Sequence, residues 1–198
     1  TVWSASQGTH GLRTNLAKVF GLPPDKMRVI FLDGSGSYGT NGGDHVAADA
    51  LLLEARAMFL AGQAAESRPQ LDKALTLARE QHYIRGEYNA LAQLGLLNWQ
   101  AGTYGTAADL LEQSLQLARQ AQDVRREIYI LNNLGIVAEA RLQFSAAVGF
   151  YEQAQKIARK IGDRVGEATL LINMGLASLA SGDFVRAGVY SEQGGVIS

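Results

Sequence analysis

Apolar residues in the middle of the chain recur at steps of three and four, the period of an amphipathic α-helix. Between residues 125 and 163 they form two stripes, Ile128 to Ala138 and Phe144 to Ala158. Leu142-Gln143 interrupts the pattern between them, and Gly162 follows the second stripe at a position suited to a helix C-terminus. The pattern predicts two antiparallel helices joined by a short turn.

The same pattern returns every 40 residues. Small residues keep this step in both stripes, and aromatic residues keep it near the turn: Gly95, Gly135 and Gly175; Ala107, Ala147 and Ala187; Tyr104, Phe144 and Phe184. We expect the small residues to let the two helices approach closely and the aromatic rings to fill the space beside the turn. A fixed period of this length predicts a stack of helical hairpins.

We predict four units over residues 45–198, at 45–84, 85–123, 124–163 and 164–198. The first is degenerate, because Ala64 stands where the others have an aromatic residue. The last is expected to be truncated and to fray at Gly194-Gly195, since each glycine inside a helix costs about 1 kcal/mol.

The repeated residues resemble the tetratricopeptide repeat, with Leu-Gly in the first helix, Gly182-Asp183-Phe184 at the turn and then Ala187. The spacing is similar to the long-helix variety of kinesin light chains, Pins-type adaptors and many bacterial regulators. The resemblance implies a mostly α fold, a right-handed superhelix of antiparallel helix hairpins (a solenoid). It also implies a protein–protein interaction scaffold, which binds a peptide or a partner domain in a concave groove lined by the first helices.

In related long-repeat adaptors, the polar residue before the Leu-Gly pair holds the backbone of an extended peptide. The matching positions here are Gln93, Asn133 and Asn173, and an amide offers both a donor and an acceptor. Residues expected to supply pockets for ligand side chains are Tyr129, Trp99, Ile136, Glu139 and Arg126. The alternative is that the asparagines are solvated polar residues on an exposed helix face and that Trp99 belongs to the core.

The first 44 residues do not share the period and predict a small βαβ fragment. Val2–Ser4 and Met27–Leu32 are expected to be strands, with a helix between them that Gly21 and Pro23-Pro24 end. The glycines of Gly34–Gly39 formally match the dinucleotide-binding fingerprint. We reject that reading, because four more residues precede the next helix and no second parallel strand bearing an acid follows.

The runs Val2–Gly8, Gly11–Arg13, Val29–Phe31 and Gly34–Gly42 resemble part of the molybdopterin-binding large subunit of molybdenum hydroxylases, in the isoquinoline and nicotinate dehydrogenase branch. The resemblance implies that Gln7 reaches the molybdenum oxo group and that Tyr38-Gly39 lies beside it. The match covers about a quarter of the chain, without the segment that carries the family's catalytic glutamate. We therefore interpret these residues as relics that bind no cofactor. Two alternatives stay open: a fragment of a molybdopterin-dependent hydroxylase fused to repeats, and a chimeric chain without a selected function.

Composition and charge argue against several classes of function, including nucleic-acid binding and iron–sulfur chemistry. The 198 residues have a net charge of -1, which gives no electrostatic case for nucleic acid. The absence of cysteine excludes disulfides and iron–sulfur clusters and fits a cytoplasmic protein, and no apolar run is long enough to span a membrane. No catalytic constellation and no metal site emerge, so we expect a protein or peptide ligand, no cofactor and no enzyme activity of its own. A start without Met and an end inside a helical pattern suggest a fragment, and the oligomeric state is open.

Overall fold

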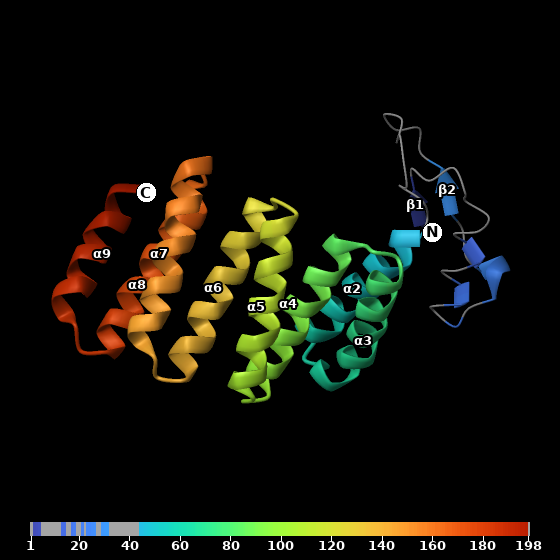
Figure 1. Cartoon of the computed structure of the whole chain (residues 1–198), viewed down its shortest axis with the longest axis horizontal. Helices are drawn as coiled ribbons and strands as arrows, with labels where there is room; N and C mark the ends of the chain where they lie inside the picture. Colours follow the sequence, from blue (N-terminus) through green and yellow to red (C-terminus); the bar gives the residue numbers. More distant parts are fainter. Residues whose placement is uncertain are drawn as a thin grey trace. The chain divides into compact units, whose positions relative to one another are not determined.

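The computed structural model describes residues 2–4, 13–14, 17–18, 21, 23–26, 29–31 and 44–197 (Figure 1). The chain forms two compact units, Thr1–Ala90 and Leu91–Ser198, and each is described by itself. The prediction of a mostly α fold is confirmed, since residues 44–197 form helices joined by turns of two or three residues.

Consecutive helices pack as antiparallel neighbours within each unit, α2 with α3 in the first and α5 through α9 in the second, because such short turns reverse the chain direction. Their bounds are α2 Asp44–Leu60, α3 Ala64–Glu80, α4 Ile84–Gln100, α5 Tyr104–Gln120, α6 Val124–Ala140, α7 Phe144–Ile161, α8 Arg164–Ala180 and α9 Phe184–Ile197. Helix α9 continues through Gly194 and Gly195 to Ile197, and the expectation that this end frays stays a prediction. The expectation that the ring of Phe184 fills the space beside the turn is wrong, since 72% of this residue is exposed.

Turns between the helices share one backbone feature, a residue with positive φ at every twentieth position. Glycine takes four of these positions and larger residues take three: Gly62, Gly102, Gly162 and Gly182; His82, Gln122 and Leu142. At Leu142, φ is 60°, and the next amide, Gln143 N–H, donates to the Ala138 carbonyl at 2.9 Å. This bond closes the helix end in the manner of a Schellman motif, which requires a left-handed residue before it.

Leu142→Gly is expected to raise the free energy of unfolding by about 1 kcal/mol. The left-handed conformation costs a residue with a Cβ about 1–2 kcal/mol, and glycine avoids that cost at some expense in chain entropy. The leucine side chain is 75% exposed, so its removal loses little burial. Urea unfolding would measure the change, with Leu142→Ala as the control that keeps the strain. Equal stability of the Gly and Ala variants would contradict the prediction.

Close approach of the two helices of a hairpin is confirmed at two of the three predicted glycines. A Cβ on Gly95 would lie 2.8 Å from Leu111 Cγ, and a Cβ on Gly135 would collide with the ring of Tyr151. The prediction is wrong at Gly175, where the nearest atom would be 3.9 Å away. The reason is that Ser191 takes the position, 40 residues on, that Leu111 and Tyr151 occupy in the preceding hairpins.

Ion pairs connect the second helix of one hairpin to the first turn of the next. They recur with the 40-residue period: Arg79–Glu87 at 2.9 Å, Arg119–Glu127 at 2.7 Å, and Arg159–Glu167. The arginine side chains are about half exposed and the carboxylates are more buried, so each pair stabilises by about 1 kcal/mol at most. Glu87, which looks like an ordinary exposed helix charge in the sequence, is therefore one partner in a repeated contact.

In the N-terminal part, β1 (Val2–Ser4) and β2 (Val29–Phe31) pair in parallel, with Val2 opposite Val29. Residues 13–14 and 17–18 are helical, and Pro24–Lys26 forms a 3-10 turn. The bounds of the intervening helix and the whole of 32–43 lie outside the described residues. The βαβ fragment as a unit, and its resemblance to a molybdopterin-binding domain, therefore stay predictions.

Candidate partner-binding surface

The first helices of the repeats build the candidate surface, with residues 91–100 of α4 followed by α6 and α8. A hydrogen bond joins the last two: Asn173 Nδ2 on α8 donates to Asn132 Oδ1 on α6 at 2.7 Å. Asn173 and Asn132 are both half-buried. Adjacent first helices are thus in contact, and amide side chains lie at the junction between them.

Asn133, the next residue along α6, is only 4% exposed. Its Nδ2 makes no hydrogen bond with any of the described residues. The interpretation of Asn133 as a solvated residue is therefore wrong. An unpaired buried polar group costs about 1–3 kcal/mol and is uncommon in folded proteins. Asn133 shares this status with other buried side chains, such as Gln155 on α7, whose Nε2 also makes no hydrogen bond with the described residues. Gln93 is half-buried at the equivalent position of α4.

Tyr129 and Arg126 form a contact one turn apart on α6. The guanidinium carbon of Arg126 lies 5.1 Å from the centre of the Tyr129 ring, a cation–π arrangement. Tyr129 is 41% exposed. An aromatic ring held in place by a cation and still open to solvent suits contact with a ligand side chain. Trp99 and Ile136 are half-buried, so each also presents part of its side chain.

Glu139 is committed to an internal contact. The hydroxyl of Tyr151 donates to Glu139 Oε1 at 2.6 Å, and Tyr151 is fully buried. Burial raises the pKa of Tyr151, and the hydrogen bond to Glu139 raises it further. The carboxylate therefore holds α7 against α6.

Sequence reasoning missed Asn132. The period places Asn133 and Asn173 in equivalent positions, yet the side chains that bond are 41 residues apart. The Asn132-Asn133 dipeptide could have indicated this contact. Consecutive residues of a helix point in different directions, so one of two adjacent amides can face the neighbouring helix while the other faces elsewhere. Gln7, Tyr38 and Gly39 lie outside the described residues.

A hollow of about 430 Å³ lies between the second helices α7 and α9. Its lining residues are Ser145, Val148, Gly149, Glu152, Arg186, Val189 and Tyr190.

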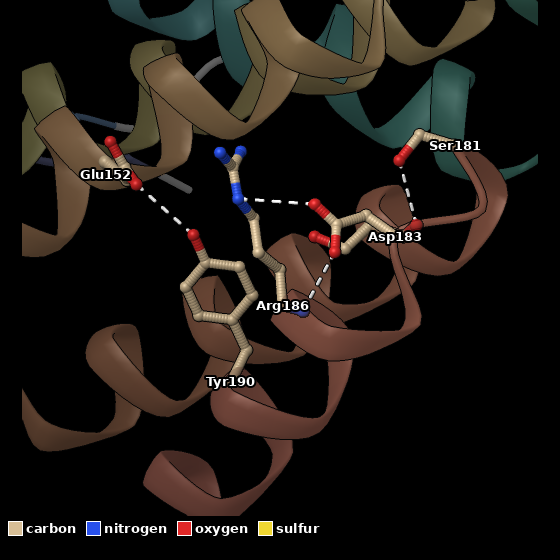
Figure 2. A network of polar contacts seen from close by, with 6 residues as sticks. Glu152, Ser181, Asp183, Arg186 and Tyr190 are labelled. Carbon is tan, nitrogen blue, oxygen red and sulfur yellow. Dashed lines mark hydrogen bonds and ion pairs between the residues drawn. The ribbon is translucent and has the colours of Figure 1, made fainter.

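Three polar side chains of this lining, Glu152, Arg186 and Tyr190, have partners (Figure 2). The Tyr190 hydroxyl donates to Glu152 at 3.2 Å, and Arg186 pairs with Asp183 at 3.3 Å. Burial, followed by the charge of Glu152, raises the pKa of Tyr190. The hydroxyl bond ties α9 to α7, so the network has a structural explanation.

No three His, Asp or Glu side chains gather as a metal site would require within the part of the chain that the structure describes. Among the same residues, no helix combines the length and the apolar character needed to cross a membrane.

Comparison with protein families finds that residues 86–160 match the family model described as Tetratricopeptide repeat. Solved structures agree over a longer stretch. BtubC (BKLC) from P. vanneervenii superposes with a TM-score of 0.72 at 17% identity over 80% of this chain, and the kinesin light chain repeats of Podosopora anserina with 0.63 at 19% over 76%. A Rap protein complexed with Competence and Sporulation Factor gives 0.71 at 15% over 76%.

These likenesses establish the fold: residues 86–160 match the tetratricopeptide repeat model, and the helical hairpins are similar in fold to kinesin light chain repeats. The chain spans 66% of BtubC, 74% of the kinesin light chain repeats and 42% of the Rap protein. A search of curated protein sequences gave no match.

Proposed function

We propose that the repeats form a protein–protein interaction scaffold, which binds a peptide segment of a partner protein across α4, α6 and α8. The observation that carries the proposal is the buried Nδ2 of Asn133, which makes no hydrogen bond with the described residues. The atom has less than 1 Å² of accessible surface, so a ligand backbone carbonyl reaches it only when the Asn133 side chain turns outward from α6. Further support comes from the fold, since a Rap protein of this architecture is known in complex with Competence and Sporulation Factor.

The spacing of the amides suits an extended ligand. Packed helices lie about 8–10 Å apart, and an extended chain advances about 3.3 Å per residue. Successive amides at Gln93, Asn133 and Asn173 would therefore meet about every third ligand residue. Ligand side chains between those points would contact Tyr129, with Arg126 beside it favouring an acidic or aromatic group. The proposal requires neither a cofactor nor a catalytic step.

The experiment is selection of a randomised peptide display library on the whole chain, with the affinity of one selected peptide measured by fluorescence anisotropy. Asn173→Ala is expected to weaken binding about tenfold, the effect of about 1.4 kcal/mol for amide hydrogen bonds lost to a bound backbone.

Gln113→Ala is the matched control, since it removes an exposed amide from the second helix α5 and is expected to leave the affinity unchanged. Circular dichroism verifies that both variants keep their helices. Failure to select any peptide, or equal affinity of the native chain and Asn173→Ala, would contradict the proposal.

A further inference from the structure

The hollow between α7 and α9 has an apolar centre. Val148 on α7 lines it and is 6% exposed, and Val189 on α9 lines it and is 46% exposed. Val185, one turn before Val189 and on the same face of α9, is 80% exposed. At the repeat positions of the two α9 valines, α7 has Ser145 and Gly149. The apolar surface beside the hollow is therefore a feature of α9 that the repeat does not require.

Gly149 contributes to the space in this hollow. A Cβ at this position would have no atom within 4 Å, whereas a Cβ at Gly135 would collide with Tyr151. Gly149 therefore serves no close approach between the described helices, although glycine lowers the stability of a helix. At the same repeat position α5 has Asp109 and α9 has Val189. The missing side chain allows a group from outside the chain to approach α7 closely.

Opposite charges stand at the two ends of the hollow. Arg186 occupies the repeat position of Ala146, and Glu152 lies six residues further along, hence about 9 Å away along the helix axis. Gly149 is midway between these two levels. Arg186 pairs with Asp183 through Nε, and its two terminal nitrogens point away from that carboxylate (Figure 2). Glu152 uses one oxygen for its bond with α9, and its other oxygen can accept a further hydrogen bond.

The order of these groups, positive, apolar and negative, suits one face of a helix. Helix residues three apart share a face and are separated by about 4.5 Å along the axis, so three of them span about 9 Å. Three alternate residues of an extended strand would span about 13 Å, more than the separation of the two charges.

We propose that this hollow, independently of the peptide-binding surface, binds one helix of a partner protein. A leucine or another large apolar side chain of that helix enters beside Gly149. An acidic residue lies one turn away on the side of Arg186, and a basic residue lies one turn away on the side of Glu152.

Most of the affinity is expected to come from the apolar side chain, because its burial removes apolar surface from water. The side chain of Arg186 is 63% exposed, and exposed ion pairs contribute little. The charges therefore determine how the helix is oriented, and the space at Gly149 determines whether it binds. Substitutions of the two kinds are expected to have different effects.

The test is selection on the whole chain of a display library of alanine-based helical peptides, randomised at three positions at steps of three residues. Fluorescence anisotropy then measures the dissociation constant of one selected helix. Gly149→Leu fills the hollow and is expected to raise this constant at least about tenfold. The variant is expected to fold, because a Cβ here meets no atom within 4 Å, and circular dichroism checks this. Gly105→Leu, at an equally open position of α5, is the control that keeps the affinity.

Charge reversal tests the order of the groups. Selection on Arg186→Glu is expected to replace the acidic residue of the helix with a basic one and to keep the apolar residue. Asn173→Ala, which is expected to weaken the other site, is expected to leave helix binding unchanged, so the two proposals fail separately. Recovery of no helix, equal affinity of the native chain and Gly149→Leu, or selection of the same charges by Arg186→Glu would each overturn the proposal.

Discussion

Gly135→Ala is expected to lower the free energy of unfolding by about 2 kcal/mol, although alanine favours a helix over glycine by about 1 kcal/mol. The added methyl group collides with the ring of Tyr151. That ring has no room to move, because the residue is fully buried and its hydroxyl is bonded to Glu139 at 2.6 Å. The two helices must separate, and the packing between α6 and α7 is lost over several residues.

Gly175→Ala is the matched control, at the equivalent position 40 residues on. The nearest atom to its added Cβ is 3.9 Å away, an ordinary contact, so the gain in helix propensity remains and stability rises by up to about 1 kcal/mol. Urea unfolding of the two variants measures the difference. Changes of the same sign and size would show that the Tyr151 contact does not limit the approach of α6 and α7.

Asn133→Leu is expected to separate stability from binding. Leucine has a similar size and replaces the unpaired Nδ2 with apolar groups, so the free energy of unfolding rises by about 1 kcal/mol. Binding of a selected peptide is expected to weaken more than tenfold, because the donor that the ligand would satisfy is gone. Such a trade-off is typical of residues retained for function.

Asn98→Leu provides the contrast. Asn98 is 7% exposed, but its Nδ2 donates to the Leu94 carbonyl at 2.8 Å and its Oδ1 accepts from Thr103 at 3.0 Å. Its replacement is expected to lower stability, since it breaks bonds that the fold makes. If Asn133→Leu also destabilises the chain, or if the variant still binds peptide fully, Asn133 has a structural role and the binding proposal loses its main support.

The sequence predicts this fold well where local features, such as an apolar stripe or a single glycine, determine where a helix forms or ends. The stripe of Ile128 to Ala138 is a helix, and Gly162 ends α7 with φ of 73°, as a C-terminal glycine should. Leu142 shows where such prediction fails, because a leucine has no preference for the left-handed conformation that it adopts here. The packed helices on either side impose that conformation, which local preference does not reveal.

Contacts between helices were harder to predict, because they depend on the offset with which the helices pack. The period aligned Asn133 with Asn173, whereas the bond joins Asn173 to Asn132. Likewise, Gly175 was expected to be crowded like Gly135, and the outcome depended on Ser191 in the facing helix. Both outcomes depend on a pair of residues on facing helices. The repeat pattern compares one position at a time and does not predict such a pair.

The turns have a consequence for how such a chain changes over generations. Four kinds of residue (Gly, His, Gln and Leu) occupy the same left-handed position, and the backbone takes the same path through all of them. The direction of the chain is therefore set by the helices, and the turn residue alters only the stability, by about 1–2 kcal/mol. These sites can drift in sequence without moving the surfaces that the repeats present, as long as the rest of the array absorbs the loss.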